Sequence, residues 1–254
     1  MATLASGIRS EIERERSFFL KLALAMAFVI VAGFSFNVAA GRSTFAAPLL
    51  LHVHALVFFG WLVLFVAQSF LAASGSVRLH RRLGLLALLW VPVMVVLGLA
   101  VTRHSVRAIG GPPFFDTNEF LFGNSIGLLA FALTVGAALV MRARPDWHRR
   151  LMCGAMAGLT GPGFGRLLPM PFLIPWGWWV AAVVAPMMFI LAGMVWDWRR
   201  KGRVHAAWLW GAGILIGSQL VADAIAYSPM GLAITRDMVA GTPGAMRDMR
   251  AFFP

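Results

Sequence analysis

Charged residues are scarce in this chain. Asp, Glu, Lys and Arg make up 13% of its 254 residues, whereas apolar residues make up 60%. Soluble domains carry roughly 25% charged residues, and a soluble chain of this composition would lack the polar surface that keeps it in water. The scarcity of charge excludes an ordinary soluble protein, and we predict an integral membrane protein.

Cysteine and lysine are also nearly absent. The single cysteine, Cys153, excludes an internal disulfide and any metal site built from several cysteines. The last apolar segment (205–227) contains no lysine, which excludes a retinal Schiff base of the rhodopsin kind. The chain also lacks a glycine-rich phosphate loop with a lysine and a serine-elbow motif. No catalytic residue is identified from motifs.

Long apolar segments are present instead, and each is long enough to cross a bilayer. A transmembrane helix needs about 20 mostly apolar residues. We predict an all-α membrane bundle of seven transmembrane helices (18–227), preceded by a cytoplasmic segment (1–17) and followed by an external tail (228–254). Gly161-Pro162-Gly163 predicts a kink or break in the fifth helix. The seven helices are predicted at about 18–38, 48–73, 80–102, 119–141, 148–168, 174–196 and 205–227.

The basic residues indicate the orientation of these helices. If the N-terminus lies in the cytoplasm, 15 of the 22 Lys and Arg residues fall in the N-terminal segment and the cytoplasmic loops. Lys and Arg concentrate on the cytoplasmic side of membrane proteins. We therefore predict that the N-terminus is inside and the C-terminus outside. The net charge of +12 is explained by this distribution, so we expect lipid, and no nucleic acid, as the partner.

A short motif recurs where the odd-numbered helices begin. Leu79-His80-Arg81-Arg82-Leu83-Gly84 matches Trp147-His148-Arg149-Arg150-Leu151-Met152 in its His-Arg-Arg-Leu core, and His205 takes the equivalent place before the seventh helix. The recurrence of this motif suggests an old internal repeat, in which helices 2–3 and 4–5 are equivalent hairpins. It places three histidines at one depth on the cytoplasmic side, with Gln68 nearby at the end of the second helix and Asp197 at the end of the sixth.

Polar residues within the apolar segments predict a binding site. His54, Trp61 and Gln68 are spaced by seven residues, so they share one face of a helix. Two histidines on facing helices can ligate a haem iron, and neighbouring arginines can pair with its propionates; the same groups can instead bind a lipid phosphate or a divalent metal. The predicted cofactor-binding residues, with haem b as the candidate cofactor, are His80, His148, His54, Gln68, His205, Arg81 and Arg149.

Helix rise places a second polar group near the outer boundary. Arg166 lies 18 residues after His148, and Asp223 lies 18 residues after His205, so both side chains reach about 27 Å from the inner histidines. An ion pair between Arg166 and Asp223 would neutralise two charges that are costly in a membrane. The predicted outer polar cluster consists of His54, Arg166, Asp223 and Glu119, with Asn124 as a further candidate.

Plainer interpretations of the same residues remain open. The His-Arg-Arg segments can be interfacial anchors that bind anionic lipid head groups. His54 and Gln68 can hold helices together by hydrogen bonds, and an Arg166–Asp223 pair can be purely structural. Besides cofactor binding with a redox or cofactor-handling role, the sequence allows a proton-coupled transporter of small molecules or lipids, and a non-catalytic subunit of a membrane complex.

The motifs also resemble those of a family. The order of residues 14–34, His52-Val53-His54, Trp61, Gln68 and the three histidine-containing helix starts is similar to an uncharacterised family of bacterial multi-pass membrane proteins. The resemblance implies seven helices in a bacterial inner membrane and no established activity. The His-Arg-Arg-Leu-Gly start is also similar to helices of membrane b-type cytochromes. Those proteins place paired histidines at two depths, whereas this chain has no clear second set.

Overall fold

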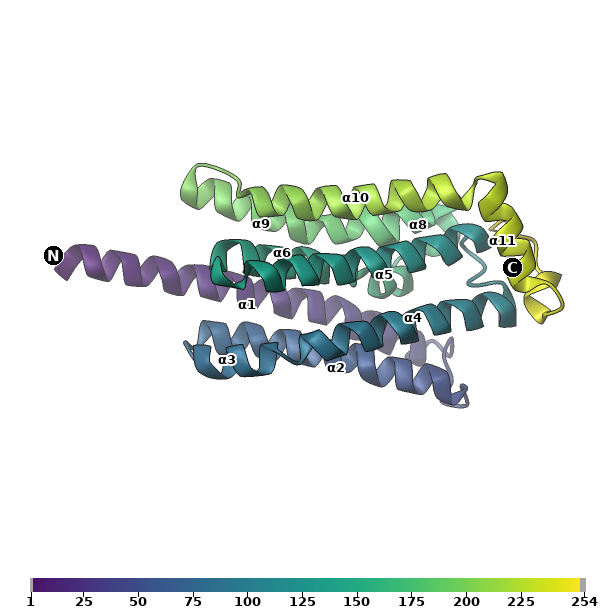
Figure 1. Ribbon diagram of the computed structural model, residues 1–254, viewed down its shortest axis with the longest axis horizontal. Helices are drawn as coiled ribbons and strands as arrows, with labels where there is room; N and C mark the ends of the chain where they lie inside the picture. The colour runs from purple at the N-terminus through teal and green to yellow at the C-terminus, as the bar shows by residue number, and fades with distance from the viewer. Residues whose placement is uncertain (1, 252–254) are drawn as a thin grey trace.

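The computed structural model describes the backbone of residues 2–251 and the side chains of residues 11–251, and this part of the chain is helical without strands. Figure 1 shows the long helices lying side by side in one bundle. The main helices are α1 (Ala2–Ala39), α2 (Leu49–Ala73), α3 (Val77–Gly84), α4 (Ala87–Ile109), α5 (Thr117–Val140), α6 (Pro145–Gly158), α7 (Gly161–Leu167), α8 (Gly177–Trp179), α9 (Ala185–Lys201), α10 (Ala206–Ala226) and α11 (Pro229–Val239). Single turns lie at η1 (Met141–Ala143), η2 (Met170–Leu173), η3 (Val180–Val184) and η4 (Pro243–Met246).

The bundle has two ends, which we name by the loops that form them. The proximal end contains the loops around residues 74–86, 141–147 and 201–206, and the N-terminus projects beyond it (Figure 1). The distal end contains the loops around residues 40–48, 110–116 and 168–176 together with α11. Helix α5 lies between α4, α6 and α10, with which it makes extensive contacts.

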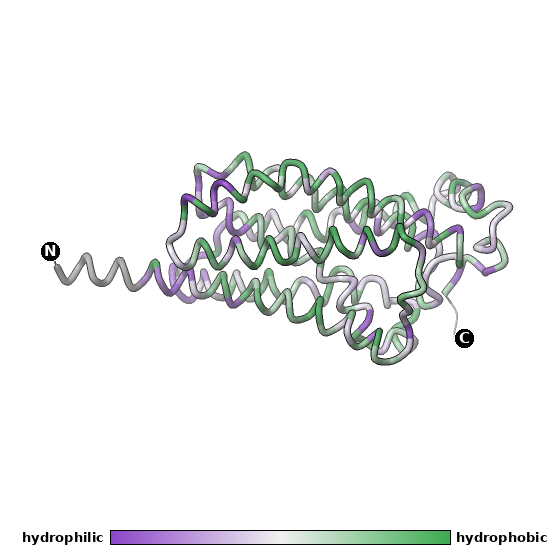
Figure 2. The backbone as a smooth tube through the Cα atoms, turned by 90° about the horizontal axis from the view of Figure 1, so that it is seen from below, coloured by the Kyte–Doolittle hydropathy of each residue, from purple (hydrophilic) through white to green (hydrophobic). Residues whose placement is uncertain are grey.

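Six helices in the described part of the chain are long and apolar enough to cross a membrane. Apolar side chains cover the outside of the bundle, such as Leu56 (74% exposed) and Leu133 (75% exposed). Figure 2 shows hydrophobic residues along the helices and hydrophilic residues gathered toward the two ends. This distribution is that of a multi-pass membrane protein, and the predicted all-α membrane bundle is confirmed. The six candidate spans are Glu11–Ala39, Leu49–Ala73, Ala87–Ile109, Thr117–Ala143, Gly177–Lys201 and Ala206–Ala226.

The predicted fifth helix (148–168) is not one continuous helix. It consists of α6 and α7, which carry the chain from the proximal to the distal end in two pieces, each too short to count as a span by itself. The break at Leu159-Thr160 precedes Gly161-Pro162, where proline removes a backbone donor. The break was predicted from these residues, and the count is corrected to six continuous spans and one broken helix.

Two other predicted helices also differ in detail. The predicted helix 80–102 is divided into α3 and α4 by turns at Leu85-Leu86, so α3 is a separate short helix. The predicted helix 174–196 begins later, at α8, and contains the π-helical turn η3 before α9. His80 therefore lies on a short helix of its own, separate from the span α4 that follows it.

Helices α1 and α7 approach each other at backbone distance. A Cβ atom placed on Gly33 would lie 2.4 Å from the carbonyl oxygen of Gly163. A Cβ atom on Gly163 would lie 2.9 Å from the carbonyl oxygen of Val29. Small residues allow membrane helices to pack this closely, and the contact holds the broken helix against α1.

The segment after α10 folds over the distal end. The Arg247 guanidinium donates hydrogen bonds to the carbonyl oxygens of Gly110 (2.6 Å), Gly111 (2.8 Å) and Pro112 (3.0 Å). The backbone nitrogen of Thr117 donates to the carbonyl of Met249 over 2.7 Å. These bonds use carbonyl groups beyond the end of α4 that would otherwise need water, so the tail forms part of the folded structure.

Candidate functional site

Two of the predicted histidines face each other at the proximal end. The rings of His80 on α3 and His148 on α6 have centres 6.2 Å apart and planes at 84°. The Nδ1 atom of His80 lies 3.2 Å from the carbonyl oxygen of Gln68, and that of His148 lies 2.8 Å from the carbonyl oxygen of Ala138. A carbonyl oxygen can only accept, so each Nδ1 carries the hydrogen. In the neutral form of each ring, Nε2 then holds a lone pair.

The surroundings of His80 favour its neutral form. Burial lowers the pKa of His80, and the nearby His148 and Arg81 lower it further, while the hydrogen bond to the Gln68 carbonyl opposes this shift. A neutral imidazole with a free Nε2 is the form that ligates metals. The second nitrogen of metal-binding histidines is usually held by a carbonyl or carboxylate group, as both are here by a carbonyl.

The face of α2 that carries His54, Trp61 and Gln68 is lined with unpaired polar atoms. His54 Nδ1, Trp61 Nε1 and both side-chain amide atoms of Gln68 are buried without a hydrogen-bond partner. Leaving one buried polar group unpaired costs about 1–3 kcal/mol. The predicted shared face is therefore present, and these four side-chain atoms have no partner on the neighbouring helices.

Only one member of this face lies beside the histidine pair. The Gln68 carbonyl binds His80, and a Cβ atom on Gly84 of α3 would lie 3.8 Å from the Gln68 side-chain nitrogen. His54 precedes Gln68 by 14 residues, or about 21 Å along α2, and it stacks on Phe58 with ring centres 4.1 Å apart. His54 therefore lies well apart from His80 and His148 along the bundle, and its part in their site stays a prediction.

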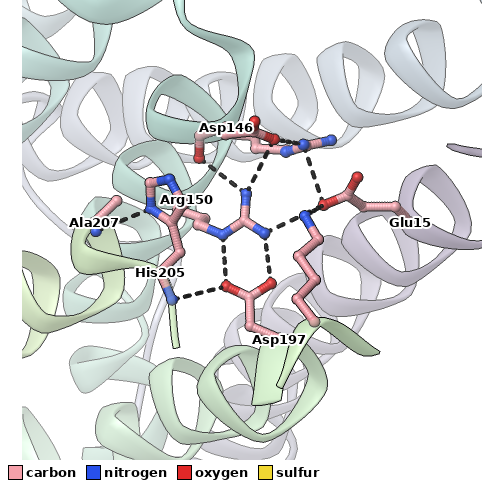
Figure 3. A network of polar contacts seen from close by, with 8 residues as sticks. Glu15, Asp146, Arg150, Asp197, His205 and Ala207 are labelled. Carbon is pink, nitrogen blue, oxygen red and sulfur yellow. Dashed lines mark hydrogen bonds and ion pairs between the residues drawn. The ribbon is translucent and has the colours of Figure 1, made fainter. Parts of the chain in front are cut away.

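A buried charge network lies at the same end of the bundle, and the sequence did not predict it. Arg150 has 0% exposure, and its Nε donates to Asp197 over 2.8 Å while Nη2 bonds the other carboxylate oxygen. Figure 3 shows the guanidinium bonded to Asp197, to Glu15 and to Asp146. Glu15 on α1 is 3.2 Å from Arg150 and 2.9 Å from Lys201. The network thus joins α1, α6 and α9.

Two residues assigned to the cofactor have other roles at this end. Arg149 pairs with Glu15 (3.1 Å) and with Asp146, so its guanidinium is held by carboxylates. His205 caps α10, where its Nδ1 accepts a hydrogen bond from the backbone nitrogen of Ala207 over 3.1 Å (Figure 3). Burial and the nearby Arg150 lower the pKa of His205. Of the predicted set, His80, His148, Gln68 and Arg81 remain together.

The predicted outer cluster is rearranged at the distal end. Arg166 donates to the Pro162 carbonyl over 2.8 Å and lies 3.9 Å above the ring of Phe34. Asp223 instead accepts hydrogen bonds from Trp179 (2.7 Å) and Gln219 (2.7 Å). The Arg166–Asp223 ion pair is absent from the ion pairs formed within residues 11–251.

The carboxylates of the distal end lie near one another. Glu119 is 5% exposed, and the charges of Asp223 and Asp116 act on it. The hydroxyl of Tyr227 donates to Asp116 over 2.9 Å. Burial first, and then the field of these three carboxylates, raises the pKa of Tyr227. Asn124 does not join this group by a side-chain bond, since its amide donates to the Phe120 carbonyl of its own helix.

Comparison of the chain with protein families, with curated proteins and with solved structures gave no match. The functional interpretation therefore rests on the geometry of the two histidines and their neighbours.

Proposed function

We propose that the protein is a membrane electron-transfer protein in which His80 and His148 ligate the iron of haem b. The observation that carries the proposal is the pair of facing imidazoles, each fixed through Nδ1 to a backbone carbonyl and each with a lone pair on Nε2. The two histidines come from equivalent positions of the repeated motif on α3 and α6, and the carbonyls that hold them come from α2 and α5.

The donor set favours haem over a bare metal ion. The described part of the chain contains no group of three or more His, Cys, Asp or Glu side chains that could hold a metal. Zinc normally takes four ligands, so two histidines would leave it short, whereas haem supplies four nitrogen ligands of its own. The ring centres of His80 and His148 are 6.2 Å apart, so one group held between them would be within reach of both imidazoles.

The neighbouring residues have defined roles in this proposal. The Gln68 and Ala138 carbonyls orient the two rings, and the unpaired Gln68 amide provides a donor and an acceptor beside them. Arg81 is exposed and close enough to His80 to affect its charge, so it can pair with a propionate. When held there, haem would supply one-electron redox chemistry. The function therefore requires a redox partner in or on the membrane.

The orientation of this site follows from the distribution of charge. Most of the basic residues, 15 of 22, lie toward the proximal end of the bundle. The positive-inside rule supports a cytoplasmic proximal end, and thus an electron-transfer site on the cytoplasmic side of a bacterial inner membrane. The alternatives of a proton-coupled transporter and of a structural subunit stay predictions.

An absorption spectrum tests the proposal directly. The protein is expressed with ample haem precursor, purified in mild detergent and measured in its oxidised and dithionite-reduced states. We expect a Soret band that sharpens and shifts on reduction, with one haem per chain by the pyridine haemochrome assay. Substituting either proposed ligand, as His80→Ala or His148→Ala, should lower haem content by more than half.

The matched control is His52→Ala. His52 is an exposed histidine on α2 whose Nε2 contacts the Phe45 carbonyl at the distal end, and its loss should leave the spectrum unchanged. A wild-type protein without a Soret band would end the haem proposal. So would a band that survives in both ligand variants while each remains folded.

A further inference from the structure

A cleft at the distal end has a one-sided charge. It has a volume of about 490 Å³ and lies between the start of α2, the last turns of α4 and the turn η4. Arg103, His104 and Arg107 of α4 line it, and no carboxylate does. Leu50 and Ala100 give it an apolar wall.

The two arginines are available to an anion. Neither takes part in the ion pairs formed within residues 11–251. Arg107 is held in place because one of its Nη atoms donates to the Met238 carbonyl over 3.0 Å, while its other donors are not used by that bond. Arg103 lies one turn earlier on the same helix and is exposed. Arginines four residues apart on a helix lie on one face and can both donate hydrogen bonds to one phosphate.

The helix dipole does not account for this arrangement. A cation in the last turn of a helix is stabilised by the carbonyl groups there, which is sufficient reason for Arg107 near the end of α4. The effect is confined to the last turn, and Arg103 precedes the end of α4 at Ile109 by six residues. Only 7 of the 22 Lys and Arg residues belong to the distal end. The presence of both Arg103 and Arg107 in one cleft therefore needs another explanation.

The position of the cleft indicates the kind of anion. It lies where the apolar span of α2 begins and that of α4 ends, so it is at the level of lipid head groups. Its apolar wall continues into surface residues that face the bilayer, such as Leu49 (77% exposed). We propose that the cleft binds the phosphate of an anionic lipid head group, with Arg103 and Arg107 as the phosphate ligands and His104 as an additional donor.

Thermal unfolding of the purified protein in a neutral detergent tests this site. The probes are phosphatidylglycerol, phosphatidylcholine and soluble glycerol phosphate, each titrated into the same sample. Phosphatidylglycerol should raise the melting temperature of the wild type at concentrations where phosphatidylcholine has no effect. Arg103→Gln should weaken this response at least tenfold in concentration.

Arg236→Gln is the matched control, because it removes the same charge from an exposed position on α11 at the same end. It should respond like the wild type. An equal loss in Arg103→Gln and Arg236→Gln would overturn the proposal, since net charge alone would explain both. An equal response to phosphatidylcholine would also overturn it. If glycerol phosphate alone gives the full effect, and Arg103→Gln abolishes it, the cleft binds free phosphate and the lipid assignment is wrong.

Discussion

Removal of Arg150 should destabilise the bundle more than removal of any one of its acidic partners. Its guanidinium bonds both carboxylate oxygens of Asp197, one oxygen of Glu15 and the backbone carbonyl of Asp146. Arg150→Met leaves Asp197, which is 1% exposed, without its cation. Breaking a buried pair from one side costs about 3–5 kcal/mol. In Asp197→Asn, by contrast, Arg150 keeps Glu15 and the Asp146 carbonyl, so the loss of stability should be smaller.

The unfolding temperature in detergent measures both effects. A loss of 1 kcal/mol lowers the melting temperature of a chain of this size by roughly 2–4 °C. We therefore expect Arg150→Met to lower it by about 6–20 °C. Combining Arg150→Met with Asp197→Leu should restore most of the loss, because no buried charge is then left unpaired and Glu15 still has Lys201 and Arg149.

A surface carboxylate in the same network is the control. The Asp146 side chain is 55% exposed, and exposed ion pairs contribute about 0–1 kcal/mol, so Asp146→Asn should shift the melting temperature by a few degrees at most. Equal drops in melting temperature for Arg150→Met and Asp197→Asn would refute the reasoning. They would show that the guanidinium contributes to stability only through its pair with Asp197. Failure of the double variant to recover would refute it as well.

Two further predictions concern helix packing and pH. Gly33→Ala should lower the melting temperature, because its Cβ would lie 2.4 Å from the Gly163 carbonyl oxygen. Gly136→Ala on α5 is the control: its Cβ would have nothing within 4 Å, so the melting temperature should stay unchanged or rise. Equal effects of the two substitutions would show that α1 and α7 do not pack as described. Because the pKa of His205 is lowered in the folded protein, the unfolded chain takes up more protons in mild acid, and stability should fall as the pH drops below about 6.5. His205→Asn preserves a side chain that can cap α10 and should make melting temperature less dependent on pH between about 5 and 7; an unchanged slope would contradict this role.

The sequence predicts the membrane bundle well because the length of an apolar segment is a one-dimensional property. Six predicted segments correspond to spans of the structure, and Gly161-Pro162 marked the break in the remaining one. The repeated His-Arg-Arg motif also predicted that His80 and His148 lie at one level, and their rings are in contact range. These features depend on distance along a helix, which is fixed by the rise per residue.

Rotation about the helix axis could not be predicted in the same way. The count of residues placed Arg166 and Asp223 near one end, but Arg166 faces Phe34 of α1 while Asp223 faces Trp179 of α8. Which neighbour a side chain meets depends on the packing of several helices, and no spacing within one helix contains that information.

A signal for Glu15 was nevertheless present in the sequence. Glu15, Phe19, Leu22 and Met26 are spaced by four, three and four residues, and all four are buried on one face of α1. That spacing is the helical pattern of a buried face. Glu15 lies within the segment predicted as cytoplasmic (1–17), and its spacing extends the buried face of α1 into that segment.

The two copies of the His-Arg-Arg motif differ because their neighbours differ. The second copy packs between α1 and α9, whose Glu15 and Asp197 hold Arg149 and Arg150 in place. The first copy lies on α3, which packs chiefly on α2, and its Arg81 and Arg82 are exposed. The helix that carries His148 is therefore anchored by a buried charge network. His80 lies on the short helix α3, which the turns at Leu85-Leu86 separate from α4.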